Sequence, residues 1–214
     1  MMFKSVKQKI LVLAPHTDDG ELGCGGAIHK FLNDGHEVFY AAFSACELSV
    51  PSHLPKDILI KEVKLATASL GIIPENLFLY NYEVRTFSFH RQDILQDMIN
   101  LKNKIEPDLV FAPSLNDLHQ DHSTIASEAL RAFKTTSILS YELPWNNLSF
   151  TTTCFIKLSD LDIAAKVTAM EHYESQSHRQ YANEFFLKGL ARTRGVQINS
   201  EYAEVFEVVR WIII

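Results

Sequence analysis

The sequence ILVLAPHTDDGELGCGG, residues 10–26, joins an apolar run directly to a cluster of polar side chains. A short run that is apolar throughout is typical of a strand buried on both faces of a parallel sheet. Pro15 cannot donate to the hydrogen-bond ladder, so we expect the strand to end there. One imidazole and two adjacent carboxylates follow, and a helix is expected to begin at about Glu21. The strand therefore delivers candidate metal ligands to its carboxyl end.

The rest of the chain alternates between helical and strand-like hydrophobic periodicity. Helical spacing of apolar residues continues to about residue 34 and returns at residues 57–70, 91–105 and 123–133. Strand-like segments lie between these helices, at residues 37–44, 77–80, 109–112 and 137–142. The alternation predicts an α/β fold, a Rossmann-like doubly wound and mostly parallel sheet with helices on both faces. Right-handed crossovers predict the core order 3-2-1-4-5, in which strands 1 and 4 are neighbours.

Composition narrows the class of protein further. The chain of 214 residues is 47% hydrophobic and has no Pro-, Gly- or Ser-rich interruption, which predicts a single domain over residues 1–214. A net charge of -6 and scattered basic residues argue against a nucleic-acid partner. Three distant cysteines and the lack of a signal-like or membrane-spanning run predict a cytoplasmic protein. The apolar residues 208–214 predict either an added strand within the monomer or a contact in a homo-oligomer.

A second polar cluster, PSLNDLHQDH at residues 113–122, follows the fourth strand. Ligands bind beyond the carboxyl ends of strands at a switch point, so both clusters are expected to face one crevice. Together they offer His16, Asp18, Asp19, His119, Asp121 and His122. These donors suit a divalent metal of the zinc type, which in catalytic sites keeps three protein ligands and an open position. Three of the six are therefore expected to bind metal and the others to handle protons.

Both clusters resemble those of the PIG-L/LmbE-like metal-dependent N-deacetylases, whose signature is a strand followed by (P/A)-H-P-D-D and later by H-x-D-H. In this chain they read PHTDD at residues 15–19 and HQDH at residues 119–122. Isolated residues further along the chain also look like family positions, among them Glu62, Lys166, Ser175 and Glu204. On these residues the resemblance runs the whole length of the chain.

The resemblance implies a role for each polar residue of the two clusters. It implies three metal ligands: His16, Asp19 and His122. It implies that Asp18 is the general base, that His119 polarises the substrate carbonyl, and that Asp121 orients and tunes His119. The expected metal is Zn²⁺, and a set of two imidazoles and one carboxylate accepts Fe²⁺ as well.

The implied activity is removal of an acetyl group from an N-acetylated sugar or a glycan-linked precursor. Such hydrolysis needs a metal-activated water, a positioned base and stabilisation of an oxyanion, which these residues can supply. Two alternatives remain open, a hydrolase of a different small amide and a catalytically silent metal- or sugar-binding module. A receiver-like domain is disfavoured, because the third strand leads into Tyr80 and Asn81 without a phosphoacceptor Asp.

Substrate contacts are less clearly marked in the sequence. The family often has a basic residue at the position that Leu59 occupies here. Candidate contacts are Arg85, Arg91 and Asn116, with Tyr82, His178, Arg179 and Tyr181 as further possibilities. The alternative, favoured for any one of them, is a solvated loop residue. Guanidinium groups suit a phosphate or sugar hydroxyls. Residues 142–147, after the fifth strand, form either part of the substrate rim or an ordinary turn.

Overall fold

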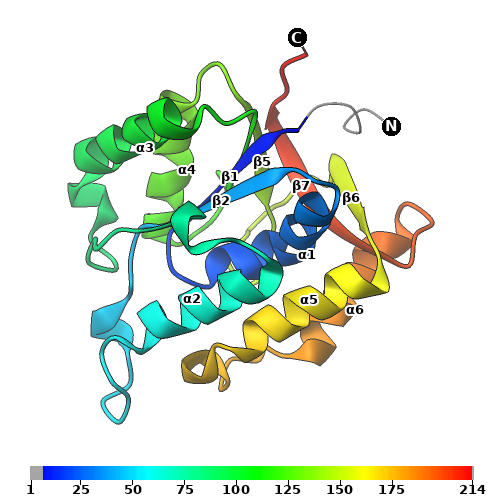
Figure 1. Ribbon diagram of the computed structural model, residues 1–214, viewed down its shortest axis with the longest axis horizontal. Coiled ribbons are helices and arrows are strands. Elements are labelled where there is room, and N and C mark those ends of the chain that lie inside the picture. Colours follow the sequence, from blue (N-terminus) through cyan, green and yellow to red (C-terminus); the bar gives the residue numbers. More distant parts are fainter. Residues whose placement is uncertain (1–6, 214) are drawn as a thin grey trace.

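The computed structural model of the protein describes residues 7–213, which form a seven-stranded sheet between two layers of helices (Figure 1). The strand order is β3-β2-β1-β4-β5-β7-β6. The strands are β1 (Lys9–Ala14), β2 (Glu37–Ala42), β3 (Leu77–Leu79), β4 (Leu109–Pro113), β5 (Ser137–Tyr141), β6 (Cys154–Leu158) and β7 (Tyr202–Arg210). Strands β1 to β5 pair in parallel, and β7 is antiparallel to β5 and β6. The predicted α/β class and core order are confirmed.

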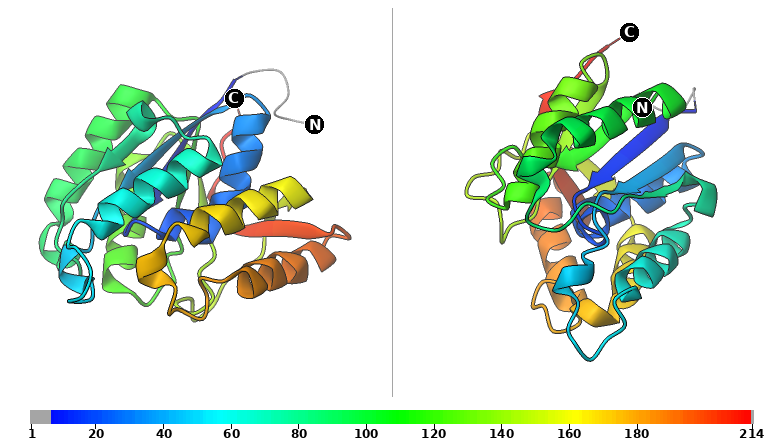
Figure 2. Two further views of the ribbon diagram at one scale, coloured as in Figure 1. Left: turned by 60° about the horizontal axis from the view of Figure 1, so that its bottom comes forward. Right: turned by 90° about the vertical axis from the view of Figure 1, so that its left-hand side faces the viewer.

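Helices cover both faces of the sheet (Figure 2). They are α1 (Asp19–Asn33), α2 (Ile58–Leu70), α3 (Arg91–Ile105), α4 (Gln120–Ala132), α5 (Asp160–Glu171) and α6 (Glu184–Val196). Helices α1, α2 and α5 pack on one face, α3 and α4 pack together on the other, and α6 lies along β7. Short 3₁₀ turns lie at η1 (Glu47–Ser49), η2 (Pro74–Asn76), η3 (Phe87–Phe89) and η4 (Glu174–Gln176). Within residues 7–213, no helix is long and apolar enough to cross a membrane.

Strand β1 is buried on both of its faces, as its unbroken apolar run predicts. Ile10 and Val12 belong to the core beneath α1, α2 and α5, whereas Leu11 and Leu13 belong to the core beneath α3 and α4. All four side chains are at most 1% exposed. Because full burial of such a side chain contributes about 1.5–3 kcal/mol, this strand anchors both layers and fixes the place where its polar loop emerges.

The structure departs from the predicted elements at both polar clusters and in the second half of the chain. Helix α1 begins at Asp19, two residues earlier than expected. Helix α4 begins three residues earlier than expected, because the Nδ1 atom of His119 accepts a hydrogen bond from the backbone N–H of Asp121 and caps the helix. Strand β6 and helices α5 and α6 have no counterpart among the predicted elements. The C-terminal apolar residues enter β7 up to Arg210, as an added strand within the monomer. Ile214, the last residue of that predicted segment, lies outside the described residues.

Strands β1 and β4 are hydrogen-bonded neighbours, with Val12 opposite Phe111. Since the two strands run in the same direction, the loops that follow Ala14 and Pro113 leave the same edge of the sheet. The two polar clusters therefore meet at that edge.

Candidate metal centre

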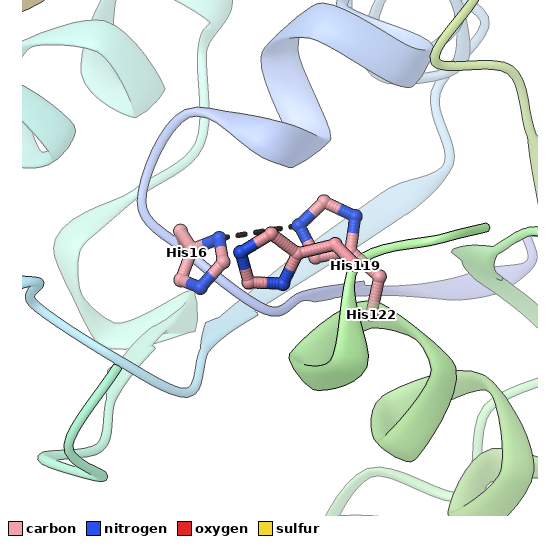
Figure 3. A group of neighbouring side chains, drawn as sticks. All are labelled: His16, His119 and His122. Carbon is pink, nitrogen blue, oxygen red and sulfur yellow. Dashed lines mark hydrogen bonds between the residues drawn. The ribbon is translucent and has the colours of Figure 1, made fainter. Parts of the chain in front are cut away.

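Three imidazole rings converge where the two loops meet (Figure 3). His16 comes from the loop after β1, and His119 and His122 come from the start of α4. One nitrogen from each ring lies within 4.8 Å of a nitrogen from each of the others, a spacing that could hold a metal ion. His122 is buried, whereas His16 and His119 are partly exposed.

Asp19 completes a tighter set of donor atoms with two of these rings. The Oδ2 atom of Asp19 lies 3.1 Å from Nδ1 of His16 and 3.2 Å from Nε2 of His122. The two nitrogens lie 3.2 Å apart. Zinc bonds of about 2.0–2.1 Å at tetrahedral angles would separate ligand atoms by roughly 3.3 Å. These three atoms therefore have nearly the spacing of one face of a tetrahedral site, and they fit a metal of the zinc type.

Each of these two imidazoles donates a hydrogen bond to a buried carboxylate from the ring nitrogen that lies outside the donor triangle. The Nδ1–H of His122 donates to Oδ2 of Asp117 at 2.8 Å, and the Nε2–H of His16 donates to Oδ2 of Asp121 at 3.1 Å. Both carboxylate side chains are fully buried. When each ring is neutral, its one remaining proton lies on the nitrogen that donates to the carboxylate. The lone pairs of His16 and His122 then point into the triangle of donor atoms, as in metal-ligating histidines.

Asp117 is not among the predicted site residues, and Asp121 lies elsewhere than predicted. The carboxylate of Asp121 bonds to His16 and lies 4.0 Å from Nδ1 of His119. It is instead the backbone N–H of Asp121 that donates to His119. The run NDLHQDH contained a signal for Asp117, because a carboxylate five residues before a histidine at a helix start can turn back onto that ring.

Replacing Asp117 by Asn is expected to lower the affinity for zinc by about 10- to 100-fold, because His122 would lose the charged acceptor that orients it and increases its basicity. Competition with a chromophoric chelator measures this affinity. Asp93→Asn is the matched control, since that side chain lies exposed on α3. Unchanged zinc affinity in a folded Asp117→Asn protein would contradict the assignment of His122 as a supported ligand.

Electrostatics in the metal-free protein hold protons on the two histidines. Burial lowers the pKa of His122, but the carboxylates of Asp19 and Asp117 outweigh this effect and raise it to about 10. The pKa of His16 is lowered by burial and raised by its bonds to Asp121 and Asp19, with a net rise to about 8. Burial acts against ionisation of Asp19, yet the charge and hydrogen bonds of the two rings hold its pKa well below its usual value.

Zinc binding at pH 7 is expected to release close to two protons. Both histidine pKa values lie above 7, so each ring is mostly protonated and must lose its proton to bind metal. Affinity should accordingly fall as the pH is lowered. Calorimetry in buffers of different ionisation enthalpy counts the protons, and binding without proton release would show that the rings are already neutral.

The neighbouring aspartates face different surroundings. Asp19 is 5% exposed and belongs to the donor triangle, whereas Asp18 is partly exposed and lines the adjoining cleft. Burial and the negative charge of Asp19 raise the pKa of Asp18 to about 6. A carboxylate with a pKa close to neutral is well matched to accepting and returning a proton.

His119 can act as a hydrogen-bond donor toward the cleft. Burial and the positive charges of His122 and His16 lower its pKa to about 4, so the ring is neutral at neutral pH. Because its Nδ1 atom accepts from the backbone of Asp121, the ring proton belongs on Nε2. That N–H is available to a substrate oxygen.

Two buried tyrosines hold the loop that carries the aspartates. The hydroxyl of Tyr173 lies 2.7 Å from the carbonyl oxygen of Thr17 and 2.9 Å from Oε1 of Glu21. The hydroxyl of Tyr40 contacts Glu21 and accepts a hydrogen bond from the N–H of Gly20 at 3.1 Å. A Cβ atom at Gly20 would lie 2.4 Å from the Tyr40 ring, so this approach requires glycine. The loop is therefore fixed from beneath.

A cleft of about 480 Å³ opens over the metal centre. Among the residues proposed for substrate contact it is lined by Arg85, His178, Arg179 and Tyr181. Trp145 also lines it and stacks on the Tyr181 ring, with centroids 3.9 Å apart and an angle of 6° between the rings. The segment after β5 is thus part of the rim.

Two of the predicted substrate contacts lie elsewhere. The Nε–H of Arg91 donates to the buried carboxylate of Glu128 at 2.7 Å, which holds this guanidinium against α4. Asn116 is exposed, and its backbone N–H donates to the hydroxyl of Ser114. Neither residue is among those that line the cleft over the metal centre.

The sequence of this chain is similar to that of a known protein family and to that of a bacterial protein. The family described as PIG-L, GlcNAc-PI de-N-acetylase, matches residues 11–133, more than half of the chain and the part that contains both polar clusters. A protein of Escherichia coli strain K12 named uncharacterized deacetylase YaiS is 27% identical over 181 residues, which span 79% of this chain and 92% of that protein.

Solved structures share the fold at lower identity. The N,N'-diacetylchitobiose deacetylase of Pyrococcus horikoshii has a TM-score of 0.78 at 23% identity, covering 94% of this chain and 84% of that chain. The 4-carboxy-2-hydroxymuconate hydratase GalB of Pseudomonas putida KT2440 also has a TM-score of 0.78, at 17% identity over 97% and 98% of the two chains. Since one fold carries a deacetylase and a hydratase, the reaction must be argued from the site.

Proposed function

Since the chain belongs to the PIG-L family, described as GlcNAc-PI de-N-acetylase, we propose that it is a metal-dependent hydrolase that removes acetyl from an N-acetylated sugar. The observation that carries the proposal is the triangle formed by donor atoms of His16, Asp19 and His122, with edges of 3.1–3.2 Å. These residues would hold a zinc or iron ion. When bound, such an ion supplies Lewis acidity and lowers the pKa of a coordinated water to about 7.

Asp18 is the proposed general base. Its carboxylate lies beside the donor triangle but is not part of it, and its pKa is raised to about 6 by burial and by Asp19. It would take the proton of the attacking water and later return it to the leaving amine. An amine is a poor leaving group unless it is protonated, so the second transfer matters as much as the first.

His119 is the proposed donor to the oxyanion that develops on the acetyl oxygen. His119 lines the cleft, its ring is neutral, and the backbone N–H of Asp121 donates to its Nδ1 atom, which leaves the ring proton on Nε2. A donor fixed before the reaction stabilises the developing charge without reorganisation, which is worth about 100- to 1,000-fold in rate at comparable sites. Asp121 and Asp117 act as positioning residues, because they reach the reaction through His16 and His122.

The proposed sugar substrate agrees with the form of the cleft. Trp145 and Tyr181 give one wall an aromatic surface, and sugars commonly need both apolar contact and a few placed polar groups. The similar proteins, one named as a deacetylase and one as a diacetylchitobiose deacetylase, favour an N-acetyl substrate over other amides.

The proposal is tested by incubating zinc-loaded protein with N,N'-diacetylchitobiose, N-acetylglucosamine and a panel of N-acetylated amino acids. We expect equal amounts of acetate and free amine from the sugars, loss of activity on chelation and recovery on addition of metal. Turnover of only the amino acids would indicate a different small amide as substrate. Tight binding of zinc and sugar without any release of acetate would indicate a silent binding module.

A further inference from the structure

The carboxylate of Asp18 has few contacts of its own, although a general base must be placed accurately. Within residues 7–213, it accepts a hydrogen bond from its own backbone N–H and from no other residue. By contrast, the carboxylate of Asp19 accepts from the backbone N–H of His16 at 2.9 Å and contacts two histidine rings. A base whose oxygens are free of such donors can take a proton from water, but its position then depends on its backbone.

Two hydrogen bonds fix the backbone on either side of Asp18. Its carbonyl oxygen accepts from the N–H of Leu22 at 3.0 Å, in the first turn of α1. On the other side, the carbonyl oxygen of Thr17 lies 2.7 Å from the hydroxyl of Tyr173 and 2.9 Å from that of Tyr40. These two carbonyls belong to the planar peptide groups that meet at the Cα atom of Asp18. The contacts therefore determine the direction in which its side chain leaves the backbone.

Tyr173 is the better placed of the two hydroxyl donors to Thr17. A phenol has a single proton, and both hydroxyls also contact the carboxyl group of Glu21. The hydroxyl of Tyr173 lies closer to the Thr17 carbonyl, at 2.7 Å, than to Glu21, at 2.9 Å. The hydroxyl of Tyr40 lies closer to Glu21 than to Thr17. The main hydrogen bond to the peptide before Asp18 therefore comes from Tyr173.

Tyr173 is itself fixed by packing and by a neighbouring buried hydrogen bond. Its side chain is buried at the start of η4, directly after α5. Two residues later, the N–H and the hydroxyl of Ser175 donate to the carboxylate of Glu62 on α2, at 2.9 and 2.6 Å. The donor to Thr17 is thus placed by α2 and α5, which carry none of the residues of the donor triangle. Loss of its hydroxyl should therefore leave metal binding intact.

We propose that Tyr173 is a positioning residue for Asp18, because its hydroxyl holds the Thr17 carbonyl and so places the general base relative to the metal centre. This inference rests on the proposed hydrolase function and adds a residue to its mechanism. Tyr173 is not among the residues that line the cleft. It therefore acts through the backbone of the loop after β1.

The test removes the hydroxyl and keeps the ring, by Tyr173→Phe. We expect kcat for N,N'-diacetylchitobiose to fall about 10- to 100-fold, because small displacements of a catalytic group are costly. KM and zinc affinity should stay within about twofold, since the cleft and the donor triangle are unchanged. Steady-state release of acetate and chelator competition measure these quantities.

Tyr141→Phe is the matched control. Tyr141 is also buried, and its hydroxyl donates to the main-chain carbonyl of Leu13 in β1 at 3.0 Å. Each substitution removes one buried hydroxyl that donates to a main-chain carbonyl, so the two should lower the melting temperature by similar amounts. Only Tyr173→Phe should lower kcat. An equal loss of kcat in both variants would make the effect a general result of lower stability and overturn the inference.

A double variant shows whether Tyr173 acts through Asp18. The base is already absent from the Asp18→Asn protein, so adding Tyr173→Phe should change the residual rate of acetate release by less than about twofold. Concentrated protein and long incubation make this residual rate measurable. A further loss as large as that caused by Tyr173→Phe alone would mean that the hydroxyl supports the site as a whole, and would also overturn the inference.

The wild-type rate distinguishes failure of the inference from failure of the proposed function. If the wild type releases acetate and Tyr173→Phe lowers kcat by less than about tenfold, the inference fails and the hydrolase function stands. A Tyr173→Phe protein that does not fold, as judged by circular dichroism, would make the hydroxyl a structural group and have the same meaning. No release of acetate by the wild type would overturn the proposed function, and the role of Tyr173 with it.

Discussion

Replacing Asp18 by Asn is expected to lower kcat for deacetylation by about 100- to 10,000-fold while the protein keeps its zinc. Asparagine has nearly the same shape but cannot accept a proton from water or return one to the amine. The side chain lies outside the donor triangle of His16, Asp19 and His122, so metal binding should not depend on it. Steady-state release of acetate and metal analysis of the same samples measure both quantities.

Asp93→Asn serves again as control, since it makes the same chemical change at an exposed site on α3. A variant at residue 18 that retained more than about a tenth of the wild-type rate would rule out the general-base role. Loss of zinc together with activity would instead make Asp18 a ligand, and the division of labour between the two aspartates would be wrong.

Asp19→Asn and His119→Ala are both expected to lower the rate, but only Asp19→Asn is expected to lose zinc. Two sets of three donors share His16 and His122, and they differ in whether Asp19 or His119 is third. The distances favour Asp19. Structural zinc sites gain about 10–16 kcal/mol from four ligands, so loss of one should weaken zinc binding by roughly 100- to 1,000-fold. His119→Ala should keep the zinc and lose about 100- to 1,000-fold in rate.

Chelator competition measures the zinc affinity of both variants, and acetate release measures their rate of deacetylation. Circular dichroism checks that each remains folded. If His119→Ala loses zinc and Asp19→Asn retains it, the ligands are the three histidines and not the set that includes Asp19. The role of His119 as oxyanion donor would then have to be given up.

The position of the site was predictable from the sequence because it depends on topology. An unbroken apolar run from Ile10 to Ala14 can only be buried on both faces, and right-handed crossovers make the first and fourth strands neighbours. The observed pairing of β1 with β4 follows from these two rules. His16 and His122 therefore meet although they are separated by more than a hundred residues.

The supporting contacts were not predictable in the same way. Whether Asp121 turns to His119 or to His16 depends on where α4 starts, and a capping bond from a histidine side chain moved that start to Gln120. Arg91 was attractive as a substrate contact because it follows a loop near the site. Its partner Glu128 sits more than thirty residues away on α4, and only the packing of α3 against α4 brings the two together.

Helix α5 was not predicted from the sequence, for a different reason. It packs against both α1 and α2, so its apolar residues do not form the single stripe that marks a surface helix. The isolated family positions acquire a physical role here as well. Lys166 of α5 donates to Glu204 of β7 at 2.7 Å, and Ser175 donates to Glu62 of α2 at 2.6 Å, both in buried surroundings. The first bond joins two of the late elements to each other, and the second joins the segment after α5 to α2.

The most direct test of the account is the fate of the oxygen atom of water. Zinc-loaded protein is allowed to deacetylate N,N'-diacetylchitobiose in water enriched in ¹⁸O, and the products are weighed by mass spectrometry. Hydrolysis by an activated water predicts one ¹⁸O atom in each released acetate and one free amine for each acetate. A sugar product that gains a whole water molecule, or binding with no acetate released, would contradict the assignment of this site as an amide hydrolase.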